Sequence, residues 1–276
     1  TRVGRMLMDR AAARPEPIPF YGELGSINPV FVTPSAWSAR GEEILAGYVG
    51  SYTLGMGQFC TKPGLLLVPR LDAAARSSLQ EAVTGIEPSH MLTSKLAEGY
   101  RSTRDDMARR TGIELLVSGG DGDAPAPTLL LTNVQAVADE PSILAEEMFG
   151  PASIVIQYDD PAQLVQVAEL IEGQLTVTLH AEPDDDVRAL HGAVQARAGR
   201  LIWNSWPTGV TVSYAQQHGG PYPATTASRT TSVGTAAIHR FTRPVAYQGF
   251  PEVQLPPALR DSNPWAVRRR VNGQWQ

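Results

Sequence analysis

Cys60 is the single cysteine of the 276-residue chain, and it lies in the glycine-flanked segment Gly-Gln-Phe-Cys-Thr-Lys-Pro-Gly at 57–64. This segment follows a stretch with helical spacing and precedes the apolar run 65–68. A thiol at such a turn can be presented to a cleft, because glycine loosens the backbone. Free cysteines are also among the most often buried side chains, where they act as small hydrophobic residues. From its own segment, the thiol is either a nucleophile or a core residue.

Glu23 is a candidate general base. It comes directly after the apolar run 18–21, which we expect to be a short buried strand. Functional groups of open α/β sheets collect at the carboxyl ends of strands. A carboxylate there is either a solvated loop side chain or a base whose pKa is raised by burial.

Two further segments combine polar and aromatic side chains. In Ala-Glu-Glu-Met-Phe-Gly-Pro, at 145–151, a carboxylate and a phenylalanine suit a sugar diol, although the pattern is also typical of a surface loop. Trp203, Asn204, Trp206 and His218 form either core packing or the wall of a pocket. His218 also allows a Cys–His dyad with Cys60. The chain has no dinucleotide-binding glycine motif, P-loop, Gly-x-Ser-x-Gly or His-Glu-x-x-His motif.

Apolar runs alternate with amphipathic stretches along the chain. Expected strands are 18–21, 29–32, 65–68, 113–117, 128–132, 153–158, 175–179 and 201–203, and expected helices are 1–14, 33–57, 72–84, 89–110, 161–171 and 184–197. In helix 89–110 we expect Leu92, Leu96, Tyr100 and Met107 to form the buried stripe. The alternation predicts an α/β fold of three layers, with a mostly parallel sheet covered on both faces.

Composition excludes several classes of protein. The net charge of −5 gives no electrostatic reason to expect nucleic acid or an anionic membrane surface as a partner. No apolar run reaches the roughly 18 residues of a membrane-spanning helix. One cysteine excludes an intrachain disulfide, makes a thiolate zinc site unexpected, and fits a reducing cytoplasm. We therefore expect a cytoplasmic protein without a metal.

Taken in chain order, these segments resemble the aldehyde dehydrogenase superfamily over essentially the whole chain. Glu-Leu-Gly-Ser at 23–26 is similar to the glutamate motif of that family, and 57–61 is similar to its cysteine motif. Glu-Met-Phe-Gly-Pro at 147–151 is similar to its Glu-x-Phe-Gly-Pro motif, and Asn204 to the asparagine that braces its active-site loops. Each match is weak alone, whereas the four in this order are specific.

Longer matches resemble a subgroup that contains α-ketoglutaric semialdehyde (2,5-dioxopentanoate) dehydrogenases and an NADP-dependent bacterial fatty-aldehyde dehydrogenase. These matches are 23–29, 60–64, 207–210, 218–223, 231–234 and 243–248. The chain departs from the wider family at Ser26, Ile27 and Pro63, and these departures agree with the subgroup.

The resemblance implies NAD- or NADP-dependent oxidation of an aldehyde to a carboxylic acid, with a semialdehyde such as 2,5-dioxopentanoate as substrate. Cys60 would form the thiohemiacetal and thioester, and Glu23 would be the base. Residues expected to bind the cofactor are Glu147, Phe149, Leu24 and Gly25, and those expected to support the substrate or loops are Asn204, Trp206 and His218.

The same resemblance divides the chain into three parts. Residues 1–25 would be the remnant of an NAD(P)-binding domain whose Rossmann-like part is mostly missing, 26–230 the catalytic domain, and 231–276 a C-terminal arm with an oligomerisation strand. We expect a C-terminal fragment that is inactive alone, and a homodimer or homotetramer at full length. Two alternatives remain, namely a Cys–His hydrolase and a non-catalytic truncated remnant.

Overall fold

The computed structural model describes all residues from Thr1 to Gln276. They form two compact units, Thr1–Ala237 and Ile238–Gln276. The expected division at residues 25 and 230 stays a prediction. No helix of the structure combines the length and the apolar character that crossing a bilayer would need.

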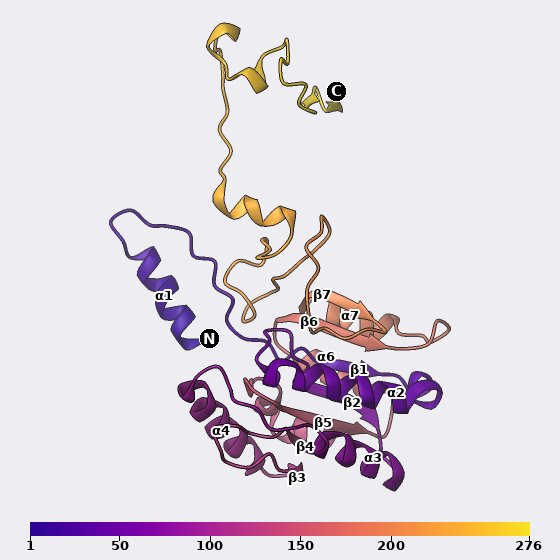
Figure 1. The fold of residues 1–276 in the computed structure, drawn as a ribbon. Coiled ribbons are helices and arrows are strands. Elements are labelled where there is room, and N and C mark those ends of the chain that lie inside the picture. Colours follow the sequence, from indigo (N-terminus) through magenta and orange to yellow (C-terminus); the bar gives the residue numbers. More distant parts are fainter. The chain divides into compact units, whose positions relative to one another are not determined.

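The first unit alternates helices and strands (Figure 1). Its helices are α1 (Arg2–Ala12), α2 (Pro34–Thr53), α3 (Ala73–Thr84), α4 (Ser94–Ala108), α5 (Val134–Asp139), α6 (Ala162–Leu170) and α7 (Arg188–Gln195). Its strands are β1 (Val30–Val32), β2 (Leu65–Pro69), β3 (Glu114–Val117), β4 (Thr128–Asn133), β5 (Ala152–Tyr158), β6 (Gln174–His180) and β7 (Ala198–Trp203).

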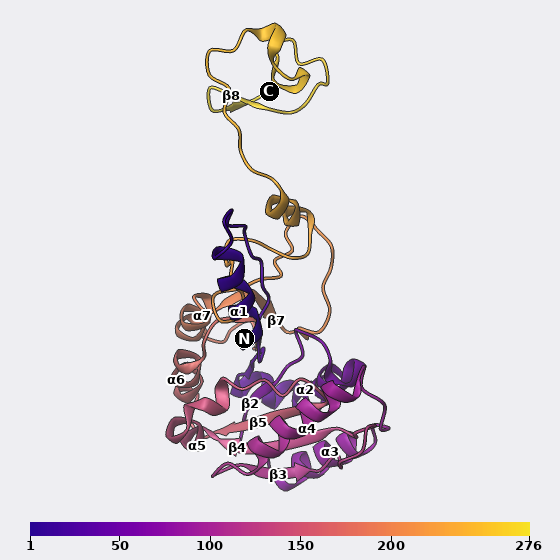
Figure 2. The same ribbon diagram turned by 90° about the vertical axis from the view of Figure 1, so that its left-hand side faces the viewer.

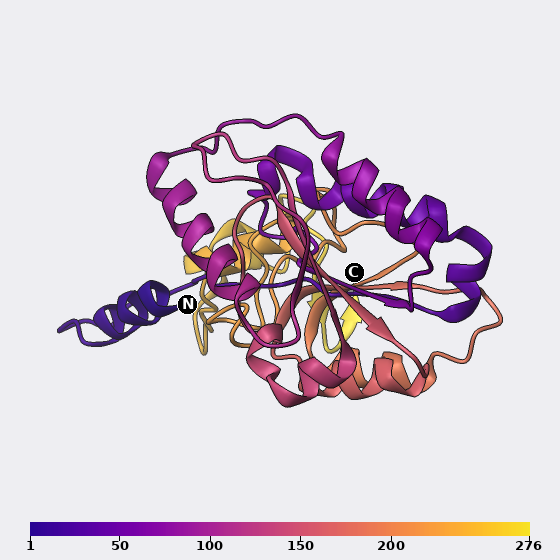
Figure 3. The ribbon, with the colours of Figure 1, turned by 90° about the horizontal axis from the view of Figure 1, so that it is seen from below.

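The seven strands form one sheet in the order β3-β4-β5-β2-β1-β6-β7. Only the edge strand β3 runs antiparallel to its neighbour, and every other pair is parallel. Central strands such as β6 are buried along their whole length, as expected for a parallel sheet with both faces covered. Helices α2 and α3 cover one face and α5, α6 and α7 the other (Figures 2 and 3). The predicted three-layer α/β fold with a mostly parallel sheet is confirmed.

Local sequence explains where the helices begin. The side chains of Thr33, Asp72, Thr93 and Asn133 each accept a hydrogen bond from a backbone N–H in the first turn of the following helix. Pro34 occupies the first position of α2, where its missing N–H costs nothing. α2 is the helix that returns along the sheet and delivers the cysteine segment.

Two expectations about local structure were wrong, and one helix was missed. Residues 18–21 form no strand, and in this region only Glu23 makes an isolated bridge, to Thr225. The helix expected at 89–110 begins at Ser94, so Leu92 precedes it and is 81% exposed. Helix α5 was not anticipated, because six residues are too few to show a helical period.

The second unit contains a short antiparallel pair, β8 (Arg270–Val271) with β9 (Gln274–Trp275). Arg268 and Arg270 lie over the Trp275 ring, each 4.9 Å from its centroid. Residues 242–248 have no regular secondary structure in this chain. Their role as an oligomerisation strand stays a prediction.

The segment that leads into β1 is fixed by one buried glutamine. The Oε1 atom of Gln174 accepts hydrogen bonds from Ser26 Oγ at 2.9 Å, Ile27 N at 2.8 Å and Asn28 N at 3.1 Å. The hydroxyl of Ser26 in turn accepts a hydrogen bond from Leu175 N at 2.9 Å. These contacts tie the residues after Glu23 to the start of β6.

We expect Gln174→Leu to lower the free energy of unfolding by about 2–5 kcal/mol, because it leaves two buried N–H groups without an acceptor. Urea unfolding of the chain measures this change. Gln166→Leu, at an exposed position in α6, is the control and should change stability by less than about 0.5 kcal/mol. Equal effects of the two variants would contradict the role given to Gln174.

Candidate active site

The cysteine segment leaves α2 through an unusual backbone. Gly55, Met56 and Gly57 have φ values of +57°, +56° and +63° in the 3-10 turn after the helix. At Gly57 a Cβ atom would lie 2.1 Å from the carbonyl oxygen of Gly150. Only glycine therefore permits this approach, and it brings the cysteine segment against the 145–151 segment.

Lys62 fastens the same two segments together. Its side chain is 3% exposed, and Nζ donates to the carbonyl oxygens of Met148 at 2.7 Å, Gly150 at 3.3 Å and Ala152 at 2.7 Å. Burial lowers the pKa of Lys62 to about 8, while the nearby charge of Glu147 acts in the opposite direction. Three acceptors for three N–H donors compensate much of the cost of burying this ammonium group.

Asn28 joins the cysteine segment to the residues after Glu23. Its Nδ2 donates to the carbonyl oxygens of Cys60 and Lys62, both at 2.9 Å. Its Oδ1 accepts from Ser26 Oγ at 2.8 Å and Thr176 Oγ1 at 3.0 Å. The backbone of Asn28 has φ +48°, a left-handed conformation that asparagine tolerates better than most residues.

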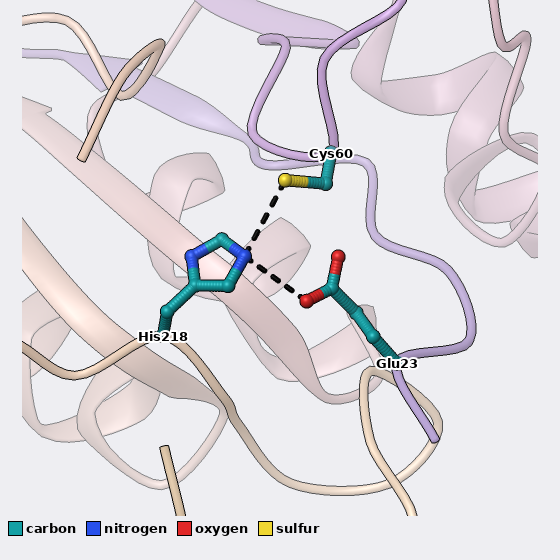
Figure 4. Close-up of side chains that lie close together, drawn as sticks. All are labelled: Glu23, Cys60 and His218. Atoms are coloured by element: carbon teal, nitrogen blue, oxygen red, sulfur yellow. Dashed lines mark hydrogen bonds and ion pairs between the residues drawn. The ribbon is translucent and has the colours of Figure 1, made fainter. Parts of the chain in front are cut away.

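Cys60, His218 and Glu23 meet at one point (Figure 4). Cys60 Sγ lies 3.4 Å from His218 Nε2, and the same nitrogen lies 3.0 Å from Glu23 Oε2. The three functional atoms are all within 4.8 Å of one another. The proximity of Cys60 and His218, which the sequence left open, is thus present in the structure.

These residues lie at the amino ends of the strands. Glu23 and Cys60 precede β1 and β2 in the chain, and Glu147 precedes β5. We expected Glu23 at the carboxyl end of a strand, and that expectation was wrong because 18–21 is not a strand.

The surroundings of His218 Nε2 favour the protonated ring, while its Nδ1 is buried without a hydrogen-bond partner. The ring is 5% exposed, and its hydrogen bonds to Cys60 and then to Glu23 raise the pKa of His218 to about 9, against the opposing effect of burial. Its backbone N–H donates to Thr231 Oγ1 at 2.8 Å, which fixes the loop that carries the ring. An imidazolium beside a sulfur atom stabilises the nucleophilic thiolate form.

Glu147 lies beside a cavity of about 380 Å³, whose lining includes Gly25, Ser26 and Tyr222. Burial raises the pKa of Glu147 to about 6, whereas Lys62 and the backbone N–H of Ser26 lower it. A Cβ at Gly25 would stand 3.1 Å from Glu147 Oε2, so the glycine leaves this carboxylate accessible from the cavity. A partly buried acceptor in a polar hollow suits a ligand with hydroxyl groups.

The remaining predicted site residues have other contacts. Leu24 donates its N–H to Ala224 O at 2.8 Å, and Phe149 is partly buried. Asn204 exchanges two hydrogen bonds with the backbone of Ala181, at 2.9 and 2.8 Å. The Trp206 ring packs against the His180 ring, with 4.8 Å between the ring centroids.

These contacts place Asn204 and Trp206 beside the carboxyl end of β6. Cys60 lies at the opposite, amino ends of the strands. Their expected roles in bracing loops and lining a substrate channel stay predictions.

Three residues around the site were missed in the sequence. Asn28 and Lys62 hold the segment of Cys60, and Arg200 in β7 is close enough for Cys60 to affect its pKa. Lys62 carries the one usable signal, a lone charge separated only by Pro63 and Gly64 from the buried apolar strand β2. Nothing in the local sequence marks Asn28 or Arg200, since both act through long-range contacts.

The profile of the aldehyde dehydrogenase family matches residues 1–244. The α-ketoglutaric semialdehyde dehydrogenase 2 of Azospirillum brasilense is 43% identical over 98% of the chain and 53% of its own length. The α-ketoglutaric semialdehyde dehydrogenase of Acinetobacter baylyi is 41% identical, with the same two coverages. The chain thus spans about half the length of these curated relatives.

Among solved structures, an aldehyde dehydrogenase from Bacillus cereus in complex with NAD⁺ is similar, with a TM-score of 0.71. The match covers 88% of this chain and 49% of that one, at 18% identity. This likeness concerns the fold alone. The family profile and the two relatives together establish that the chain belongs to the aldehyde dehydrogenase family.

Proposed function

We propose that this chain carries the nucleophile and the base of an NAD(P)-dependent dehydrogenase that oxidises a semialdehyde, such as 2,5-dioxopentanoate, to the carboxylic acid. The observation that carries the proposal is the meeting of Cys60, His218 and Glu23 at one point. The names of the two relatives support the substrate, since both are α-ketoglutaric semialdehyde dehydrogenases.

The residues present fit a nicotinamide cofactor. The cavity beside Glu147 offers a partly buried carboxylate to the hydroxyl groups of a ribose, and Gly25 leaves room beside that carboxylate. Glu147 would hold the ribose, and Phe149, Leu24 and Gly25 would complete this side of the site. The choice between NAD and NADP does not follow from these contacts.

Cys60 begins the proposed reaction. Its thiolate attacks the carbonyl carbon of the aldehyde, and a carbon–sulfur bond forms as the carbonyl electrons move to oxygen. The backbone N–H of Cys60 would donate to this oxyanion, and one such donor contributes about 3 kcal/mol to stabilising a transition state. The chemistry that the nicotinamide supplies when bound is acceptance of the hydride that leaves this carbon.

Glu23 acts in the second half of the reaction. It takes a proton from a water molecule as the water oxygen attacks the thioester carbon on Cys60. The carbon–sulfur bond then breaks, so the carboxylic acid leaves and the thiolate returns. His218 lies between both groups and would keep the thiolate and the carboxylate in place through its positive charge.

The distance from Cys60 to His218 also favours a second candidate, a cofactor-independent Cys–His hydrolase. The two functions differ in a simple measurement. A hydrolase would cleave an activated ester without NAD(P)⁺ and would give no reduced nicotinamide with any aldehyde.

Replacing Cys60 by serine tests the nucleophile. In the complete polypeptide that carries these residues, we expect Cys60→Ser to reduce formation of NAD(P)H from aldehydes by at least about 10³-fold, because a serine hydroxyl is a far weaker nucleophile than a thiolate. Circular dichroism and thermal unfolding should remain those of the parent protein. Activity within tenfold of the parent would show that another residue is the nucleophile.

Replacing Glu23 by glutamine tests the base. We expect Glu23→Gln to leave a burst of about one NAD(P)H per Cys60, because attack and hydride loss do not need this carboxylate. Steady-state turnover should fall by about 10²–10³-fold, since hydrolysis of the thioester loses its base. Rapid-mixing absorbance separates the two phases. An unchanged steady state would remove Glu23 from the mechanism.

The pKa of His218 can be measured directly by NMR titration of the ring. We expect a value of about 9 in the parent chain, and a fall toward the ordinary value of about 6.5 in Cys60→Ser or Glu23→Gln. His180, whose burial lowers its pKa to about 4, provides an internal control that should not move.

The same shift makes stability depend on pH. Because the folded state holds the His218 proton more tightly than the unfolded chain, this contribution is fully present below about pH 6.5 and is lost as the pH rises through about 9. Urea unfolding across this window should show the loss in the parent and a much smaller one in His218→Gln. A titration of His218 near 6.5 in the parent would contradict both expectations.

A further inference from the structure

The cluster of Cys60, His218 and Glu23 has the composition of a metal site. Thiolate, imidazole and carboxylate are the ligand types that Zn²⁺ takes in proteins, and each of the three residues offers one such atom. The single cysteine led us to expect no metal, because thiolate zinc sites are usually built from several Cys or His ligands. The fold supplies further ligands, since it brings a histidine and a glutamate to the one thiol.

The distances within the cluster suit one ion. With Zn–S near 2.3 Å and Zn–N or Zn–O near 2.0–2.1 Å, two tetrahedral ligand atoms lie roughly 3.3–3.6 Å apart. Cys60 Sγ and His218 Nε2 are 3.4 Å apart, and His218 Nε2 and Glu23 Oε2 are 3.0 Å apart. All three ligand atoms lie within 4.8 Å of one another. Small side-chain rotations would therefore place them around a single ion.

The backbone holds these ligands in position before any ion arrives. The carbonyl of Cys60 accepts a hydrogen bond from Asn28 Nδ2 at 2.9 Å. Glu23 forms an antiparallel bridge with Thr225, which follows His218 in the same loop region. The segments of Glu23 and His218 are thus attached to each other. A site whose ligands are held in place loses less entropy when it binds an ion.

The cluster is open to water on the side of the carboxylate. The side chain of Glu23 is 34% exposed, whereas that of His218 is 6% exposed, and Cys60 is partly exposed. An ion in solution therefore has a path to the ligand atoms. Three protein ligands leave the fourth tetrahedral position to a water molecule. The thiolate and the carboxylate together carry the two negative charges that neutralise a divalent ion.

His218 lacks an outer contact that permanent metal sites have. Its Nδ1 is buried and has no hydrogen-bond partner, whereas a ligating histidine almost always donates its second N–H to a carboxylate, a carbonyl or water. Losing such a contact weakens metal binding by roughly 10–100-fold. This arrangement suits an ion that binds and leaves, and it does not suit a permanent structural ion.

We propose that Cys60, His218 and Glu23 bind Zn²⁺ reversibly, and that the ion switches off the reaction at this site. This inference rests on the proposed function, because it takes Cys60 as the nucleophile and Glu23 as the base. The ion replaces the proton that His218 Nε2 holds between the other two groups, and that proton passes to solvent. The sulfur electron pair that would attack an aldehyde is then shared with the metal, and the carboxylate no longer accepts a proton from water.

Co²⁺ tests the site without cofactor or turnover, because it adopts similar coordination to Zn²⁺ and its absorption spectrum reports the ligand atoms. Titration of the chain with Co²⁺ should saturate at one ion per chain. We expect a thiolate-to-cobalt charge-transfer band in the near ultraviolet and the strong visible bands of a four-coordinate ion. Cys60→Ser should abolish the charge-transfer band. His218→Gln and Glu23→Gln should each weaken binding by about 10²-fold or more, since losing a ligand costs more than losing an outer contact.

His191→Gln is the matched control, since it removes an exposed histidine of α7. It should leave both the spectrum and the affinity for Co²⁺ unchanged. Circular dichroism checks that each variant keeps the fold of the parent. If His218→Gln or Glu23→Gln binds Co²⁺ as tightly as the parent, the thiol does not act in a three-ligand site, and the proposal is wrong. A parent spectrum without the charge-transfer band would also overturn it.

Inhibition is measured in the complete polypeptide that carries these residues. Zn²⁺ should stop NAD(P)H formation from an aldehyde, and removal of the ion with EDTA should restore the full rate. Mg²⁺, which prefers oxygen ligands, is the control ion and should not inhibit at the same concentration. Full activity in saturating Zn²⁺, or equal inhibition by Mg²⁺, would contradict the switch. If the parent oxidises no aldehyde, the proposed function fails, whereas the Co²⁺ spectrum still decides whether the cluster binds a metal.

Discussion

The side-chain amide of Asn28 is the contact on which the geometry of the site depends. It donates to the carbonyls of Cys60 and Lys62 and accepts from Ser26 and Thr176. One buried amide therefore joins the segment after Glu23, the cysteine segment and strand β6. Losing the amide would remove this donor from the carbonyls of Cys60 and Lys62 and this acceptor from the hydroxyl of Thr176. The relative positions of base and nucleophile follow from this single junction.

Lys62 provides a second constraint on the cysteine segment. It acts through a charged ammonium group, whereas Asn28 acts through a neutral amide. An ammonium group buried in a protein is stable only if its donors are used, and here the backbone carbonyls of Met148, Gly150 and Ala152 use them. The cysteine segment is thus attached to the 145–151 segment that carries Glu147. Since Lys62 and Glu147 also influence each other's pKa, the nucleophile's segment and the candidate cofactor carboxylate are electrostatically linked. If either segment moved, the charge of Lys62 or of Glu147 would become exposed to water or would lose its partner.

Most of the fold could be predicted from the sequence, because apolar periodicity reports burial directly. Most strands and helices of the sheet follow that pattern. The error at 18–21 arose because a short apolar run need not be buried, and Ile18 is in fact exposed. The site was only partly predictable. Cys60, Glu23 and His218 were found as residues, but their meeting depends on backbone turns such as Gly57, whose φ is +63°, and on pairs more than 150 residues apart. Local sequence carries no signal for such contacts.

Cys60, Glu23 and His218 form a cluster in which one donor, His218 Nε2, lies between two acceptors, Cys60 Sγ and the Glu23 carboxylate. The charges of these groups explain the arrangement. His218 Nε2 faces both Sγ and the Glu23 carboxylate, so a single N–H serves two groups that would repel each other if both were negative. The positive ring makes their proximity tolerable, and this requirement is also what raises the pKa of His218.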